Sequence, residues 1–309
     1  MQKIIFLVLI ITLVSCQTNT DSSVGQLSKQ SKSIIPTKII ITPPIDSLPF
    51  DDSIHSESED QIAVIPPAKS QPKEIKPKLR KKAKPSIYDV AYITGKFNQR
   101  KHPDFVRLDE KYCAYPDMYL RKEVYEAFLK MRIAAEKEGI KLVIRSATRN
   151  FFTQKRIWEN KWTGKKAIAG GENLAQTTKD PVLRAKKILR YSSMPGSSRH
   201  HWGTDIDLND LANSYFEKGK GYKMYQWMLK NAHDFGFYLV YTEKKGPKPR
   251  TGYNEERWHW TYLPTSKKIL DKAKEVLKDE EFKGFLGAET APKIHIVNNY
   301  VLGINPECL

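Results

Sequence analysis

The segment Pro195-Gly196-Ser197-Ser198-Arg199-His200-His201-Trp202-Gly203-Thr204-Asp205-Ile206-Asp207 is followed, about fifty residues later, by Glu256-Arg257-Trp258-His259-Trp260. The first segment ends in residues that alternate like a half-buried strand, over 203–208, and the second lies in a predicted strand over 257–263. Further strands are predicted over 140–146, 237–242 and 294–302. Helical patterns separate the strands, so the sequence predicts an α+β fold in which helices flank a small antiparallel sheet.

The predicted helices carry start and stop signals. Gly139 follows the apolar periodicity of residues 117–138, and Gly236 follows that of residues 222–235. Asp180 and Pro181 provide an N-cap and a first helical residue for a helix that runs to Tyr191. The other predicted helices cover 152–162 and 266–279.

The two quoted segments together offer a histidine, an aspartate, a second histidine, and a glutamate three residues before the latter. Two neutral imidazoles and a carboxylate suit Zn²⁺, and three protein ligands leave one position open for water. We therefore predict a catalytic zinc site with His200, Asp207 and His259 as ligands. Glu256 is expected to act as general base on the water, because a fourth protein ligand would close the open position.

Spacing alone leaves alternatives for these ligands. His201 adjoins His200, and because adjacent side chains of an extended chain point apart, only one of the two is expected to bind the ion. Asp205 lies two residues before Asp207, on the same face of the strand, and is a second candidate. A spacing of three would place Glu256 and His259 on opposite faces of a regular strand, so a bulge or the start of the strand is expected between them.

The N-terminus reads as an export signal. Residues 1–15 combine one lysine with a short apolar run, which is typical of a signal peptide and too short for a membrane span. Leu13-Val14-Ser15-Cys16 resembles a bacterial lipobox, and acyl chains on Cys16 would anchor the protein to a membrane. The alternative is an ordinary signal peptide with an incidental cysteine. We expect an extracytoplasmic, lipid-anchored protein of the bacterial cell envelope, on the periplasmic face of an outer membrane if the cell has one, since no aspartate follows Cys16.

Residues 16–86 are expected to form a disordered linker, because they are polar and contain Phe50 as their only aromatic residue. A compact domain is predicted over 87–280, with a C-terminal extension over 281–309 packed on it. The formal net charge of +17 is compatible with an anionic partner. The export signal argues against nucleic acid as that partner, and we expect a monomer.

Two cysteines besides Cys16 occur, Cys113 and Cys308. In an oxidising compartment they are candidates for a disulfide bridge that would tie the C-terminal tail to the start of the domain. The alternative is two unrelated thiols.

The site segments resemble the M15 family of zinc D-Ala-D-Ala carboxypeptidases and dipeptidases, the VanY-like enzymes of peptidoglycan metabolism. Pro195 to Asp207 fits the family motif without a gap, and Thr251 to His259 fits a later one in register. An upstream motif is present as residues 146–154, where Ala147, Thr148 and Asn150 depart from the family pattern. The resemblance covers roughly residues 119–262.

The resemblance selects His200, Asp207 and His259 as ligands and Glu256, not Glu255, as base, within the M15 or hedgehog-like zinc peptidase fold. It implies that Arg149 stabilises charge on the substrate and that Gln154 and Ser198 bind the terminal residue of the peptide. The implied substrates are peptidoglycan stem peptides, and the implied activity is D-alanyl-D-alanine carboxypeptidase. An L,D-carboxypeptidase, a cross-link endopeptidase and a non-catalytic peptidoglycan-binding lipoprotein are the alternatives.

Overall fold

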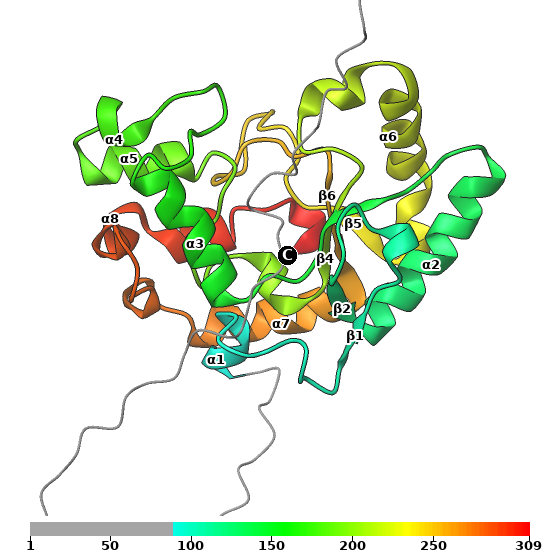
Figure 1. Ribbon diagram of the computed structural model, residues 1–309, viewed down its shortest axis with the longest axis horizontal. Helices are drawn as coiled ribbons and strands as arrows, with labels where there is room; N and C mark the ends of the chain where they lie inside the picture. The colour runs from blue at the N-terminus through cyan, green and yellow to red at the C-terminus, as the bar shows by residue number, and fades with distance from the viewer. Residues whose placement is uncertain (1–88) are drawn as a thin grey trace, which may run out of the picture. The chain divides into compact units, whose positions relative to one another are not determined.

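The computed structural model describes residues 89–309 (Figure 1). The predicted signal peptide 1–15, the lipidation site Cys16 and the linker 16–86 lie outside the described residues and stay predictions. Among the helices of the described part, none combines the length and the apolar character needed to cross a membrane.

A four-stranded antiparallel sheet lies at the centre of the fold, with the strand order β3-β4-β6-β5. Its strands are β3 (Ile144–Ser146), β4 (Asp205–Leu208), β5 (Phe237–Leu239) and β6 (His259–Tyr262). A separate two-stranded ladder joins β1 (Phe105–Arg107) and β2 (Tyr119–Arg121). The predicted α+β class with a small antiparallel sheet is confirmed, and each strand is shorter than its sequence pattern.

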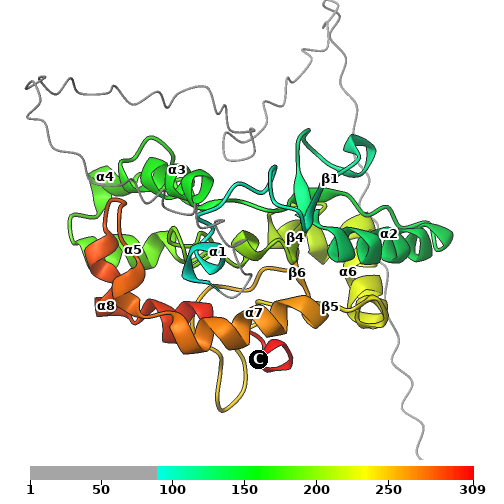
Figure 2. The ribbon, with the colours of Figure 1, turned by 90° about the horizontal axis from the view of Figure 1, so that it is seen from below.

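The helices form two groups on opposite sides of the sheet, as Figures 1 and 2 show. One group consists of α2 (Lys122–Lys137) and α6 (Gly219–Asn231). The other consists of α3 (Phe151–Trp162), α4 (Leu174–Thr177), α5 (Pro181–Ile188) and α8 (Ala291–Ile294). The remaining helices are α1 (Val90–Ile93) and α7 (Leu263–Val276).

The two central strands have one apolar and one polar face. Ile206 and Leu208 of β4 and Trp260 of β6 belong to the hydrophobic cluster that includes α2 and α6. Asp205 pairs with Thr261, and Asp207 pairs with His259, across the two strands. Since side chains alternate along a strand, these polar residues share the opposite face. Polar groups are thereby concentrated on one side of the sheet.

Local signals explain several helix ends. The Asp180 side chain accepts a hydrogen bond from the backbone N–H of Leu183, which confirms the predicted N-cap of α5. Gly236 has the left-handed conformation at φ 81° and ends the turn that follows α6, as predicted. Helix α2 begins at Lys122 and not at residue 117, because residues 119–121 pair with β1.

The predicted last strand, 294–302, is wrong. This region forms α8 and a π-helical turn, Val297–Val301. Its apolar residues Ile294, Ile296 and Val301 are buried in the cluster that also contains α5 and α7 residues. At the end of β5, Leu239 O accepts the side-chain amide of Asn305 at 2.9 Å, and the next carbonyl, Val240 O, accepts its backbone N–H at 2.8 Å. Asn305, and not the β-branched run, therefore contacts the end of this strand.

The predicted Cys113–Cys308 bridge is also wrong. The backbone of Cys113 pairs with that of Ile144 of β3 in an isolated β-bridge. The Cys308 Sγ lies 3.8 Å from the carbonyl oxygen of Leu239 in β5. These strands are the two edges of the sheet, and neighbouring strands lie about 4.8 Å apart, so the cysteines are separated by more than about 10 Å. A disulfide needs Cα atoms within about 7 Å, and both thiols are free.

Candidate metal centre and active site

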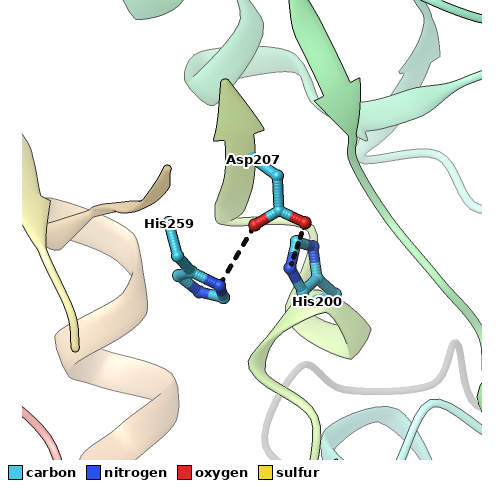
Figure 3. Close-up of side chains that lie close together, drawn as sticks. All are labelled: His200, Asp207 and His259. Atoms are coloured by element: carbon cyan, nitrogen blue, oxygen red, sulfur yellow. Dashed lines mark ion pairs between the residues drawn. The ribbon is translucent and has the colours of Figure 1, made fainter. Parts of the chain in front are cut away.

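Three elements bring the predicted ligands together on the polar face of the sheet. His200 lies in the short 3₁₀ helix Arg199–Trp202, Asp207 lies in β4, and His259 is the first residue of β6. Their ligand atoms all lie within 4.8 Å of one another, and all three residues are buried. Figure 3 shows the Asp207 carboxylate between the two imidazole rings, with Oδ2 3.3 Å from His200 Nε2 and Oδ1 3.2 Å from His259 Nδ1.

Hydrogen bonds on the far side of each ring determine which nitrogen faces the cluster. His200 Nδ1 lies 2.8 Å from the carbonyl oxygen of Ala147, to which it donates. His259 Nε2 lies 2.9 Å from Asp205 Oδ2. His200 Nε2 and His259 Nδ1 are therefore directed toward Asp207, whose buried Oδ1 has no hydrogen-bond partner. This donor set, with its outer partners, fits a zinc ion.

The structure decides between His200 and its neighbour. His201 uses both ring nitrogens inside the protein, because Nδ1 donates to Arg149 O at 2.6 Å and Nε2 accepts the N–H of Gly196 at 3.0 Å. Burial lowers the pKa of His201 to about 3, so the ring is neutral. No lone pair is left for a metal, which agrees with the choice of His200.

Asp205, the alternative to Asp207, belongs to a buried network behind His259. Its carboxylate accepts hydrogen bonds from Arg199 Nε at 2.8 Å and from the hydroxyls of Thr204 and Thr261 at 2.7 Å each. Burial opposes its ionisation, yet Arg199 and His259 hold the pKa of Asp205 well below its ordinary value. Asp205 is therefore the orienting partner of His259 and not a ligand in this arrangement.

Sequence reasoning missed the role of Arg199. This side chain is 1% exposed, donates from Nη2 to Thr261 Oγ1 at 2.9 Å, and lies over the Trp202 ring at 4.6 Å. Its contacts depend on the pairing of β4 with β6, which no local pattern specifies. The position of Asp205, two residues before Asp207 on one strand face, was the available signal.

Glu256 lies beside the ligands because the strand begins after it. The N–H of His259 bonds to Glu256 O at 3.1 Å in a tight turn, so β6 starts at His259 and both side chains reach the same cluster. The predicted start of a strand between the two residues is confirmed. Glu256 Oε2 lies 3.4 Å from His259 Nδ1, and burial raises the pKa of this carboxyl, with His259 and Arg149 opposing the shift. A carboxylate with a raised pKa is suited to proton transfer near neutral pH.

The loop before Glu256 is fixed by the guanidinium group of Arg250. Its Nε donates to Thr242 O at 2.8 Å, Nη1 donates to Tyr253 O at 2.6 Å and to Gly303 O at 3.5 Å, and Nη2 donates to Asn254 O at 3.1 Å. One side chain thus connects the end of the β5 region, the loop and the C-terminal segment. The backbone N–H of Glu256 itself donates to Tyr241 O at 3.0 Å.

A cavity of about 210 Å³ opens onto the cluster. Arg149 and Gln154 line it, together with His200, Asp207, Glu256 and His259. Arg149 Nη1 donates to Ser146 Oγ at 3.2 Å and its buried Nε has no partner, whereas Gln154 donates to Ser193 O at 2.8 Å and its Oε1 has none. Ser198 is 1% exposed and lies outside the cavity lining, so the structure brings Arg149 and Gln154, but not Ser198, to the cavity.

Two aromatic residues in the cavity wall had no assigned role. Tyr241 is buried with its ring centroid 4.8 Å from that of His259, and Trp258 contacts Tyr191 at a centroid distance of 6.2 Å. The Tyr241 contact restricts the orientation of the His259 ring. The sequence placed tryptophans near the ligands but gave no signal for Tyr241.

Residues 117–265 match the family model VanY, D-alanyl-D-alanine carboxypeptidase. A protein of Bacillus subtilis (strain 168) named "Putative carboxypeptidase YodJ" is 30% identical over 166 residues, which cover 53% of this chain. The chain spans about half, 51%, of that relative's length.

Solved structures are also similar to the chain. The LdcB LD-carboxypeptidase shares 25% identity at a TM-score of 0.39, covering 58% of this chain and 77% of its own. VanYB in complex with D-Alanine-D-Alanine shares 22% identity at a TM-score of 0.38, covering 56% of this chain and 89% of its own. By the family match, residues 117–265, which contain the candidate metal centre, are similar to the VanY family of D-alanyl-D-alanine carboxypeptidases.

Proposed function

We propose that the chain is a zinc metallopeptidase that hydrolyses peptide bonds next to D-amino acids in peptidoglycan stem peptides, with D-alanyl-D-alanine carboxypeptidase as its activity. The observation that carries this proposal is the buried group of His200, Asp207 and His259, with Glu256 within 3.4 Å of His259 at the cavity. The match of residues 117–265 to the VanY family model supports the substrate class.

The residues of the chain have separate roles in this reaction. A zinc ion held by His200, Asp207 and His259 would supply Lewis-acid activation of the carbonyl and of water. Glu256 accepts a proton from the attacking water and delivers it to the amine that leaves. Arg149 lines the cavity with an unpartnered Nε and is placed to stabilise negative charge on the substrate. Gln154 offers Oε1 to a substrate N–H in the same cavity.

Ser198 has a less direct role in this proposal. Its Oγ is buried without a hydrogen-bond partner but does not line the cavity. A contact with the terminal residue of the peptide therefore requires a local rearrangement of the 195–199 turn. In this proposal, Gln154 is the residue that binds the terminal residue of the peptide.

For the location, we propose the bacterial cell envelope, with lipid attachment at Cys16 and residues 16–86 as a tether. The support is the apolar run that precedes Leu13-Val14-Ser15-Cys16. Labelling of cells with a radioactive or clickable fatty acid tests this, since substitution of Cys16 by serine should abolish incorporation of the label.

The activity is tested on the zinc-loaded protein with defined muropeptides that end in D-Ala-D-Ala, with products read by mass spectrometry. Loss of one terminal D-Ala, absent in the Glu256→Gln variant at equal zinc content, is the expected result. Cleavage only of peptides that end in a single D-Ala would instead identify an L,D-carboxypeptidase, and cleavage only of cross-linked dimers would identify an endopeptidase. A zinc-binding protein that cleaves none of these substrates would contradict the proposal and favour a binding role.

A further inference from the structure

A second cavity, separate from the metal centre, has a strongly basic lining. It lies at α6 and the C-terminal end of α2, on the side of the sheet opposite α3 and α5 (Figure 1), and its volume is about 530 Å³. Of the described residues, none lines both this cavity and the metal cavity. We call it the basic groove, after its four cationic lining residues, Lys141, Arg145, Lys220 and Lys223.

One side of the basic groove is formed by the segment that leads into β3. Leu142 and Ile144 are 0% exposed and belong to the hydrophobic cluster that includes α2 and α6. Because side chains of an extended chain alternate, Lys141 and Arg145 are directed away from that cluster and line the groove. Their Cα atoms are separated by four residues, which is roughly 13 Å in an extended chain.

The other side of the basic groove is formed by the first turns of α6. Lys220 and Lys223 are three residues apart, so they share one face of the helix, and both are exposed. The first turn of α6 contains no acidic residue, and its N-cap residue makes no side-chain cap hydrogen bond. The positive end of the helix dipole therefore adds to the charge of the two lysines.

Little in the described part of the chain neutralises this charge. Among the described residues, none of the four cations forms an ion pair with a carboxylate. The one carboxylate in the lining, Glu138, accepts a hydrogen bond from Trp227 Nε1 at 2.8 Å. The Arg145 guanidinium lies 5.1 Å from the centroid of the Tyr115 ring, and its buried Nε has no hydrogen-bond partner. A positive potential therefore remains in the groove.

We propose that the basic groove binds a flexible polymer that carries a phosphate group in each repeat. The cations lie along two walls and are not gathered at one point, which complements a chain of anions better than a single anion. Three of the four are lysines, whose ammonium groups bind phosphate as point charges and require no fixed geometry. The site is independent of the proposed peptidase activity, because it shares no lining residue with the metal cavity.

The test is calorimetric titration of the full chain, kept soluble in a neutral detergent, with short inorganic polyphosphate. We expect binding whose constant falls linearly with salt concentration on a double-logarithmic plot, because counterions are released from the polymer. Inorganic phosphate and dihexanoylphosphatidylglycerol each carry one phosphate, so each should bind roughly 100-fold more weakly.

Substitution of Lys220→Gln and Lys223→Gln together should weaken polyphosphate binding roughly tenfold and lower the magnitude of the salt slope by about one to two. The matched control is Lys130→Gln with Lys230→Gln, which removes the same charge from exposed positions of α2 and α6 outside the groove. Both variants keep the basic residues between 69 and 84, so their difference reports on the groove. Circular dichroism should show that both keep the fold of the parent protein.

Several outcomes would overturn the inference. Equal weakening in the two variants, or none in either, would show that the polymer binds elsewhere on the chain. Equally tight binding of inorganic phosphate would identify a site for a single anion, and tighter binding of the phospholipid would identify a lipid site. Tighter binding of poly-glutamate than of polyphosphate would exclude phosphate as the preferred group.

Discussion

The two faces of strands β4 and β6 differ in almost every physical property, although they alternate residue by residue along the same chain. Ile206, Leu208 and Trp260 face α2 and α6 and join a hydrophobic cluster. Asp205, Asp207 and His259 face the other way and form ion pairs within a buried polar network. The apolar face stabilises the fold by burying nonpolar area. Each charge buried on the polar face needs a partner of opposite charge or a hydrogen bond, because an unpaired buried charge is destabilising.

The residues that stabilise the fold by apolar burial and the residues of the candidate metal site therefore lie on opposite faces of one sheet. Charges on the polar face are held by partners that do not themselves line the cavity, such as Arg199 and Asp205. Substitutions on the two faces should therefore have separable effects, and the following predictions run from the largest expected effect to the smallest.

Asp207→Asn should remove metal binding and activity while leaving the fold in place. The substitution deletes the anionic ligand between two imidazoles, so zinc affinity should fall by more than the roughly 10- to 100-fold typical of losing an outer partner. Zinc content by atomic emission, turnover and circular dichroism are the measurements. Asp234→Asn is the control, because the Asp234 side chain is 67% exposed. An Asp207→Asn protein with normal zinc content would show that Asp207 is not a ligand.

Phe128→Ala should lower the stability of the fold and leave the activity of the folded protein unchanged. Phe128 is 0% exposed in the cluster between α2 and the sheet, so its truncation should lower the free energy of unfolding by about 3–5 kcal/mol. Turnover per folded molecule should be unchanged. Urea unfolding and activity at low temperature check both points, with Ile133→Ala, on the same helix and 56% exposed, as a control expected within about 0.5 kcal/mol of the parent protein. A loss of specific activity at equal folded fraction would show that substitutions on the apolar face also affect the site on the polar face.

Asp205→Asn should weaken the metal centre without removing it. The variant loses the charged acceptor of His259 Nε2, so zinc affinity should fall roughly 10- to 100-fold, measured by competition with a chelator. Some loss of stability should accompany it, because Arg199 is left with an uncompensated buried charge. An unchanged zinc affinity would mean that the ring of His259 is oriented by packing alone.

The pH dependence of stability should report on His201. Its pKa falls from the ordinary 6.5 to about 3 on folding, so below pH 6.5 the unfolded chain binds a proton that the folded protein does not. Stability from this residue is therefore present above pH 6.5 and is lost as the pH falls toward 3, by about 1.4 kcal/mol per pH unit. In urea unfolding of the zinc-free protein between pH 6 and pH 5, His201→Gln should reduce the slope by about one proton. Equal slopes would place the His201 pKa near its ordinary value.

Much of the site could be predicted because its signals are local. Pro195 to Asp207 and Thr251 to His259 keep the ligands and the base within two short stretches, and the residue spacing carries that information. Helix ends were predicted for the same reason, since Asp180 and Gly236 act on their own neighbours. The resemblance to a family, and not spacing, selected His200 over His201.

The features that the sequence did not predict depend on contacts between residues far apart in the chain. The role of Asp205 follows from the pairing of β4 with β6. Residues 294–302 were mistaken for a strand because β-branched composition favours strands, but their apolar residues are buried from helical turns in the cluster that contains α5 and α7. The Cys113–Cys308 bridge failed because the strand order places the two cysteines at opposite edges.

The contacts of Arg250 and Asn305 have a consequence for the order in which the protein matures. Arg250 reaches Gly303 O, and the Asn305 side chain donates to Leu239 O at 2.9 Å, so late residues hold the loop that carries Glu256. A chain made from its N-terminus can assemble α2 and its neighbours before these residues have been synthesised. We expect catalytic competence to be gained in one late step, after residue 305 has left the ribosome, so that a nascent chain is protected from premature hydrolytic activity by its own incompleteness.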